Sequence, residues 1–276
     1  MLDVCNPSSA QSGSTQTSST QTAATQSAAI QTAATQTKLA GRYHVSLAVD
    51  DCEIREAQRL RYQVFAGEMG ARLTTVLPGH DFDLYDPFCD HLLVRELASG
   101  EVVGTYRILP PGAAKRIGSY YSEQEFDFSR LHNLRPRMAE LGRSCVHRDH
   151  RSGGVITRLW LGLAEYMANH GCEYIVGCAS VGMVDGGHVA ASVYRQLSET
   201  HMAPLEWHAT PRDRLPLEAL DDGRIAPLPP LIKGYTRSGG MVCGEPAWDP
   251  DFNTADLLML LPMAQLNRNY ARRFGA

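Results

Sequence analysis

ELGRSCVHRDHRSGGVITRLWLGLAEY, the stretch from Glu140 to Tyr166, decides the fold of this chain. Its first seven residues alternate side chains and include a branched residue and a cysteine, as a β-strand does. Residues 147–154 are basic and contain two glycines, which is typical of a turn. Apolar residues at Val155, Ile156, Leu159, Trp160, Leu163 and Met167 then follow helical spacing and predict an amphipathic helix. A strand, a glycine turn and a helix form the layout in which N–H groups at a helix N-terminus bind a phosphate group.

The first forty residues differ in composition from the rest of the 276-residue chain. Residues 6–37 are almost entirely Ser, Thr, Gln and Ala, and the hexapeptide at 21–26 recurs at 31–36. Because this segment has no aromatic residue and few large aliphatic ones, it predicts a disordered low-complexity tail over residues 1–40. The segment also lacks the basic start and the continuous apolar part of a secretory signal. Residues 41–276 are long enough for one α/β domain.

The charge and cysteine content narrow the class of protein. The net charge is −4, and the tail contributes only Asp3 and Lys38, so the near-neutral balance argues against general nucleic-acid binding. No apolar run approaches the roughly 20 residues of a membrane-spanning helix. Seven cysteines without paired spacing suggest reduced thiols in a cytoplasmic protein. Three lysines accompany 23 arginines, so the cationic groups are mostly guanidinium forks that suit carboxylates and phosphates.

Periodicity elsewhere in the chain predicts further strands and helices. The expected strands are 43–49, 91–95, 101–109, 172–180, 204–209, 241–244 and 254–261, and the expected helices are 54–65, 189–197 and 263–274. Right-handed crossover makes the 172–180 strand parallel to the strand that begins at Glu140. The predicted fold class is therefore α/β, a mixed central sheet flanked by helices on both faces.

Four carboxylates gather within ten residues, at Asp81, Asp83, Asp86 and Asp90. They are open to two interpretations, a solvated acidic loop or a pocket wall that attracts an ammonium group. Their spacing lacks the glycine and the terminal glutamate of an EF-hand, and the two histidines of the turn are not spaced for one helical face. We therefore predict no metal site.

Several segments carry a resemblance to a known family. The turn at 151–154 resembles the acyl-CoA-binding turn of the GCN5-related N-acyltransferase superfamily, although Ile156 stands where that pattern has glycine or alanine. Segments 61–65, 81–86, 89–94, 103–107, 121–126 and 140–143, in this order, resemble the L-ornithine Nα-acyltransferases that begin ornithine-lipid synthesis. The chain is also similar to the acyl-homoserine-lactone (autoinducer) synthases, which usually carry a tryptophan that residues 66–73 lack. Segments 230–235 and 249–253 favour the ornithine branch.

The resemblance implies an enzyme, an N-acyltransferase. It would move a (3-hydroxy)acyl group from acyl carrier protein to the α-amino group of L-ornithine, by direct attack of the amine on the thioester, giving lyso-ornithine lipid. No cofactor would be permanently bound, because the 4′-phosphopantetheine arm enters with the donor. The alternatives are an autoinducer synthase and a non-enzymatic membrane-associated or binding domain. The 263–274 helix, apolar on one side and rich in arginine, suggests peripheral contact with the inner membrane.

The same resemblance implies roles for individual residues. Glu140 would accept the ammonium proton and Tyr194 would protonate the leaving thiolate, although a structural carboxylate and a core tyrosine remain alternatives. The other candidates are listed by role: Asp83, Asp86 and Asp90 for the side-chain ammonium, Arg107 and Arg143 for the substrate carboxylate, Arg151, Ser152, Gly153, Gly154 and Val155 for the phosphopantetheine, and Arg148 and Arg158 for docking of the acidic carrier protein. Arg61 is expected to support the acidic loop.

Overall fold

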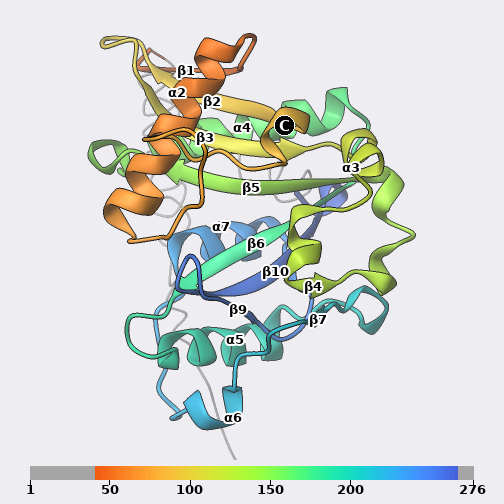
Figure 1. Cartoon of the computed structure of the whole chain (residues 1–276). Coiled ribbons are helices and arrows are strands. Elements are labelled where there is room, and N and C mark those ends of the chain that lie inside the picture. Colours follow the sequence, from red (N-terminus) through yellow and green to blue (C-terminus); the bar gives the residue numbers. More distant parts are fainter. Residues whose placement is uncertain (1–40, 267–276) are drawn as a thin grey trace, which may run out of the picture. The chain divides into compact units, whose positions relative to one another are not determined.

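The computed structural model describes residues 41–266, and the unit that carries the fold begins at Tyr43. The predicted tail and the last residues of the predicted closing helix, 267–274, lie outside the described residues. An eight-stranded mixed sheet forms the centre of the unit, with the strand order β1-β2-β3-β5-β6-β10-β8 and with β9 paired to β10 (Figure 1). The predicted fold class is confirmed.

The strands of this sheet are β1 (Tyr43–Leu47), β2 (Asp90–Glu96), β3 (Val102–Leu109), β5 (Met138–Val146), β6 (Tyr174–Gly182), β8 (Met241–Val242), β9 (Ala247–Asp249) and β10 (Thr254–Pro262). A second, two-stranded sheet pairs β4 (Phe126–Asp127) with β7 (Thr210–Pro211). Between described strands of the main sheet, only β5 and β6 pair in parallel, as the crossover argument predicts. The helix between them is the one predicted from the opening stretch.

The α-helices are α2 (Asp51–Tyr62), α3 (Pro111–Ile117), α4 (Gly154–Asn169), α5 (His188–Thr200), α6 (Leu217–Leu220) and α7 (Pro230–Ser238). A π-helical segment, η1 (Gln63–Glu68), continues α2. Short 3₁₀ turns are η2 (Asp86–Phe88), η3 (Tyr121–Gln124), η4 (Ser129–Leu131), η5 (Arg135–Arg137), η6 (Arg148–His150) and η7 (Leu205–Trp207).

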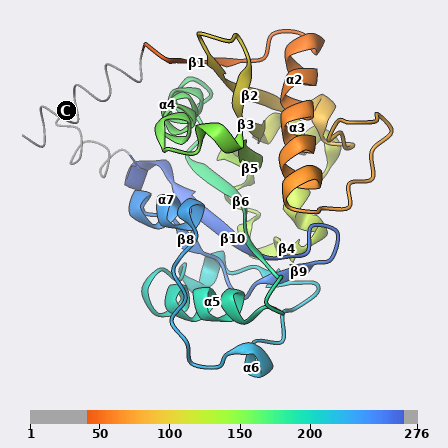
Figure 2. The same cartoon turned by 90° about the vertical axis from the view of Figure 1, so that its left-hand side faces the viewer.

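Helices α2 and α4 cover opposite faces of the part of the main sheet that contains β2, β3 and β5 (Figure 2). Helix α2 begins at the N-cap Asp50, whose side chain accepts a hydrogen bond of 2.9 Å from Glu53 N. Helix α4 buries Val155, Leu159 and Leu163 against the sheet, and these are the positions that the helical spacing predicts. The two faces of the sheet are therefore screened from water by different segments of the chain.

A buried cluster fixes the η3 turn beside the first residues of β5. Tyr120 is 1% exposed and its Oη donates hydrogen bonds of 2.7 Å to Met138 O and 3.0 Å to Arg135 O. Phe126 and Leu131 lie in the same cluster of apolar side chains. These contacts hold the η3 turn against the start of β5, so that the backbone N–H groups of the turn lie beside Glu140 of that strand.

One predicted element is wrong. Residues 204–209 do not form a strand but surround the 3₁₀ turn η7. Pro204 has no amide hydrogen to give to a neighbouring strand, and a ring nitrogen of His208 is 2.9 Å from Ala203 O, which closes the turn.

Candidate active site

The two parallel strands at the centre of the sheet separate after three residue pairs. Strands β5 and β6 pair only from Met138–Tyr174 to Glu140–Val176, although each strand has nine residues (Figure 1). At Gly177 the two strands are still close, because a Cβ atom added to this glycine would lie 2.2 Å from Leu141 O. Beyond that point the sheet is open between them.

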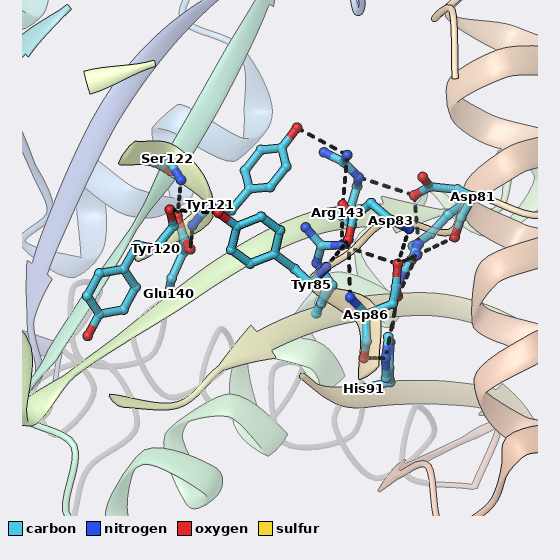
Figure 3. A network of polar contacts seen from close by, with 12 residues as sticks. Asp81, Asp83, Tyr85, Asp86, His91, Tyr120, Tyr121, Ser122, Glu140 and Arg143 are labelled. Carbon is cyan, nitrogen blue, oxygen red and sulfur yellow. Dashed lines mark hydrogen bonds and ion pairs between the residues drawn. The ribbon is translucent and has the colours of Figure 1, made fainter. Parts of the chain in front are cut away.

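Strand β5 also carries an irregularity at the opening. The register between β3 and β5 shifts opposite Arg143, which has a φ of 51°. A left-handed φ is uncommon for a residue other than glycine, and such bulges redirect side chains beside functional sites. The bulge turns Arg143 toward Tyr121, whose Oη accepts a hydrogen bond of 3.2 Å from Arg143 Nη2 (Figure 3).

A cavity of about 560 Å³ lies at this opening. Its walls come from β3, β5, β6, β10, the η3 turn and the first residues of α7. Four of the predicted site residues line it, and they are Arg107, Glu140, Arg143 and Arg151. The volume is in the range of small-molecule sites in proteins.

The acidic loop is neutralised by arginines from three elements. Arg61 of α2 is fully buried and pairs with Asp81 and Asp86, each at 2.8 Å. Arg107 of β3 pairs with Asp83 at 2.7 Å and Asp86 at 3.3 Å, and Arg143 of β5 pairs with Asp81 at 3.2 Å. The expectation that Arg61 supports this loop is confirmed.

The electrostatics of Asp83 show what this pairing does. Burial alone would raise the pKa of Asp83, but Arg107 and Arg143 lower it to about 2. Asp83 and Asp86 thus already have cationic partners, and neither lines the cavity. Asp90 lies apart from them, where its Oδ2 accepts a hydrogen bond of 2.5 Å from Tyr166 Oη. The geometry gives no support to an ammonium site on this loop.

Arg107 and Arg143 face the cavity across the ring of Tyr121. Their guanidinium carbons lie 5.3 and 4.8 Å from the ring centroid. Burial and the charge of Arg143 act in opposite directions on Tyr121, and burial prevails, raising its pKa to about 12. The phenol is therefore neutral and can donate a hydrogen bond, while both arginines stay charged beside the cavity.

Glu140 lies at the last parallel pair, where the strands begin to separate. It is 3% exposed, and its Oε2 and Oε1 accept hydrogen bonds of 2.6 Å from Tyr121 N and 2.7 Å from Ser122 N (Figure 3). Burial raises the pKa of Glu140, and the hydrogen bonds from Ser122 and Tyr121 partly oppose that effect. The η3 turn therefore fixes the direction of this carboxyl group.

Sequence reasoning missed a second acidic group on the opposite wall. The ligand atoms of Glu125, Cys178 and Asp256 lie within 4.8 Å of one another. Asp256 and Cys178 line the cavity, as does Asp249. A signal was present, because Asp256 is the one charged residue in the apolar run 254–261.

The predicted donor turn lies between β5 and α4. Gly153 has a φ of 99° and is the N-cap of α4, and Val155 is fully buried. Arg151 anchors the turn, since its Nε donates a hydrogen bond of 3.0 Å to Val146 O and its Nη2 pairs with Glu68 at 2.8 Å. Ser152 is exposed at the rim. Of the predicted turn residues, only Arg151 lines the cavity.

The remaining predicted residues lie around or away from this site. Arg148 is exposed on η6, with Glu68 at 3.7 Å, and Arg158 lies in the second turn of α4. Tyr194 of α5 does not line the cavity, and the nearest charges that act on it are those of Glu245 and Arg214. Its role as the acid for the thiolate stays a prediction that the geometry does not favour.

Comparisons with known proteins agree with this architecture. Residues 60–161 match the family model described as Acetyltransferase (GNAT) domain. The chain is 34% identical to the L-ornithine N(alpha)-acyltransferase of Brucella abortus (strain 2308), with 86% of this chain and 90% of that protein covered. It is 38% identical to the protein of the same name from Rhodobacter capsulatus, with coverages of 84% and 95%.

The chain belongs to the L-ornithine N(alpha)-acyltransferase family. A third member, from Rhizobium meliloti (strain 1021), is 37% identical, with 83% of each chain covered. This acyltransferase also shares its fold with FeeM, an N-acyl amino acid synthase from uncultured soil microbes, at 12% identity and a TM-score of 0.51, with coverages of 83% and 94%. The AHL synthase LasI aligns with a TM-score of 0.48 at 15% identity, over 80% of this chain and 90% of LasI.

The structure also bears on membrane-spanning helices and on the state of the cysteines. Between residues 41 and 266, no helix has the length and apolar character to cross a bilayer. The six cysteines in that range are all free.

Proposed function

We propose that this acyltransferase moves a (3-hydroxy)acyl group from acyl carrier protein to the α-amino group of L-ornithine, giving lyso-ornithine lipid. The name shared by the three relatives supports ornithine as the acceptor. The observation that carries the proposal is the opening between β5 and β6, where one cavity is lined by a buried carboxyl group and two arginines. A thioester and an amine can meet there away from bulk water.

The donor enters from the side of the glycine turn. Backbone N–H groups at the start of α4 and the guanidinium of Arg151 suit the phosphate of a 4′-phosphopantetheine arm. Arg148 and Arg158 lie on the rim of the same turn and suit the acidic surface of the carrier protein. The extended arm then follows β5 toward the cavity.

The reaction needs two protons to leave the ammonium nitrogen, one before the attack and one after it. The neutral α-amino nitrogen attacks the thioester carbon, so that a C–N bond forms, and as the C–S bond breaks the departing thiolate takes up the second proton of the nitrogen. We assign the ammonium proton to Glu140, because burial raises the pKa of this carboxyl group toward that of the amine. Both carboxylate oxygens already accept an N–H, so their remaining lone pairs would act directly or through one water.

Ornithine also carries a carboxylate, which requires a cation. Arg143 and Arg107 are the arginines that face the cavity beside Tyr121, and we assign the carboxylate to them. Because the product is a lipid, we propose that the enzyme works in the cytoplasm and contacts the inner membrane peripherally.

The test is to offer the purified full chain acyl carrier protein thioesters, with and without a 3-hydroxyl, together with L-ornithine. Mass spectrometry should find an Nα-acyl ornithine. Glu140→Gln should lower kcat by about 100-fold or more, since a positioned base contributes that much. Glu165→Gln, an exposed carboxylate on α4, is the matched control and should keep full activity. Acyl-homoserine lactone as the product, or full turnover by Glu140→Gln, would contradict the proposal.

A further inference from the structure

The second acidic group of the cavity has no cation of its own. Asp81, Asp83 and Asp86 are paired with arginines, and Glu140 is held by two backbone N–H groups. Among residues 41–266, by contrast, no arginine, lysine or histidine forms an ion pair with Glu125 or Asp256. Asp256 is only 5% exposed and faces the cavity. Asp256 is therefore a buried carboxyl group without a cationic partner in a chain with 23 arginines.

Burial and the neighbouring carboxyl groups disfavour the ionised forms of Glu125 and Asp256. Burial raises the pKa of Glu125 to about 9, with further contributions from Asp256 and Asp249. The pKa of Asp256 is raised as well, mainly by burial. Thr254 Oγ1 donates one hydrogen bond of 2.9 Å to Asp256 Oδ1, but a hydroxyl brings no charge. A cation that enters the cavity would therefore replace a shared proton and relieve the repulsion.

The position of the pair relative to the arginines defines what fits. Arg107 and Arg143 belong to β3 and β5, on one side of the opening, whereas Asp256 belongs to β10, beyond β6 on the other side. The two guanidinium groups thus lie on one side of the cavity and the carboxyl group of Asp256 on the other. An amino acid with a cationic side chain has the complementary arrangement, with its carboxylate at one end and its ammonium at the other.

We propose that Asp256, together with Glu125, binds the side-chain ammonium of the acceptor and thereby selects a diamino acid. This inference rests on the proposed function and replaces the acidic loop 81–90 as the ammonium site. A divalent metal is the competing occupant, since Glu125, Cys178 and Asp256 lie close enough to share one ion.

The experiment compares L-ornithine with L-norvaline, which has the same carbon chain without the terminal amine. Both are assayed with the full chain and the same acyl carrier protein thioester, for the wild type, Asp256→Asn, Glu125→Gln and the exposed control Glu199→Gln. Loss of a buried charge partner should lower kcat/KM for ornithine by about 30-fold or more in Asp256→Asn, mainly through KM. The ratio of ornithine to norvaline activity should collapse in that variant and stay unchanged in Glu199→Gln.

Four outcomes separate the inference from the proposed function. If the wild type acylates neither amine, the proposed function fails. If Asp256→Asn and Glu125→Gln keep the preference for ornithine, the inference fails while the function stands. Equal losses for both amines would overturn it too, because they would place Asp256 at the reacting nitrogen. Activity that a chelator abolishes and Zn²⁺ or Mn²⁺ restores only when Asp256 is present would assign the pair to a metal and also overturn it.

A binding measurement tests the ammonium site directly, even in a variant that is folded but has little activity. Without any donor, titration calorimetry should show ornithine binding to the wild type more tightly than norvaline, and this difference should disappear in Glu125→Gln or Asp256→Asn. Far-UV circular dichroism and thermal melts of each variant establish that it is folded. Equal affinity of the wild type for both amines would contradict the inference without reference to catalysis.

Discussion

Two aspartates of this enzyme show how the surroundings of a residue set its chemistry. Asp83 and Asp256 are both largely buried, and burial alone raises the pKa of a carboxyl group. Arg107 and Arg143 lower the pKa of Asp83 to about 2, so it is charged at any physiological pH. Asp256 has carboxyl neighbours instead, and its pKa is raised. One is part of the scaffold, and the other is suited to receive a cation from outside.

At the residue scale, Glu125→Gln should stabilise the ligand-free protein at alkaline pH. The pKa of Glu125 is about 9 in the fold against its ordinary value of 4.5, so the folded state binds the proton more tightly. Its contribution to stability is therefore complete below about pH 4.5 and is lost as the pH rises toward 9. The amide does not titrate, so its advantage over the wild type should grow between pH 4.5 and pH 9, by at most about 1.4 kcal/mol for each pH unit, and should raise Tm by several degrees at alkaline pH.

Thermal melts of both proteins from pH 5 to pH 9 measure this difference. Glu165→Gln is the control, because its carboxylate is exposed and its melts should follow those of the wild type at every pH. A gap between Glu125→Gln and the wild type that stays constant across the series would show that the carboxyl group titrates normally.

At the scale of elements, the site depends on how β5 and β6 come together and separate. The parallel pairing stops at Glu140 and Val176, and Gly177 lets β6 pass Leu141 O closely before the strands diverge. The opening, the bulge at Arg143 and the η3 turn over Glu140 are all arranged around this point. A side chain at 177 has no room unless the two strands move apart.

Gly177→Ala tests this geometry. The added Cβ would lie 2.2 Å from a backbone oxygen, which cannot swing away as a side chain could. We expect a loss of about 1–3 kcal/mol in unfolding free energy and a clear fall in activity, because the distance between the strands changes. Gly182→Ala, at the end of the same strand, is the control, since a Cβ there meets nothing within 4 Å. Urea unfolding of both variants is the measurement, and equal stabilities would refute the argument.

At the scale of the whole molecule, charge is unevenly distributed over a protein with a net charge of only −4. Arg148 and Arg158 lie on the rim of the glycine turn, while Arg116 of α3 is exposed near the opposite end of β3 and β5. An acidic carrier protein would be attracted to the first place and would be little affected by the second. The docking site of the carrier protein therefore depends on the positions of the arginines and not only on their number.

Charge-reversal variants distinguish docking at the rim of the glycine turn from docking near Arg116. Arg148→Glu combined with Arg158→Glu should raise KM for the carrier-protein thioester by about 10-fold at low salt, and the effect should shrink as salt screens the charges. Arg116→Glu makes a similar change at the far end and should leave KM near that of the wild type. Initial rates at several salt concentrations are the measurement. A KM that rises equally in both cases, or does not depend on salt, would argue against docking at this rim.

The sequence by itself determined the strand–turn–helix at 140–166, the parallel partner strand and the hairpin of β2 and β3. These follow from local spacing, because a period of two or 3.6 residues is a property of neighbours in the chain. Only the tertiary structure decided that Arg107 and Arg143 also neutralise the acidic loop, that Tyr194 lies away from the cavity, and that Glu125 meets Asp256. Which charges pair depends on which strands become neighbours, and no local pattern encodes that order.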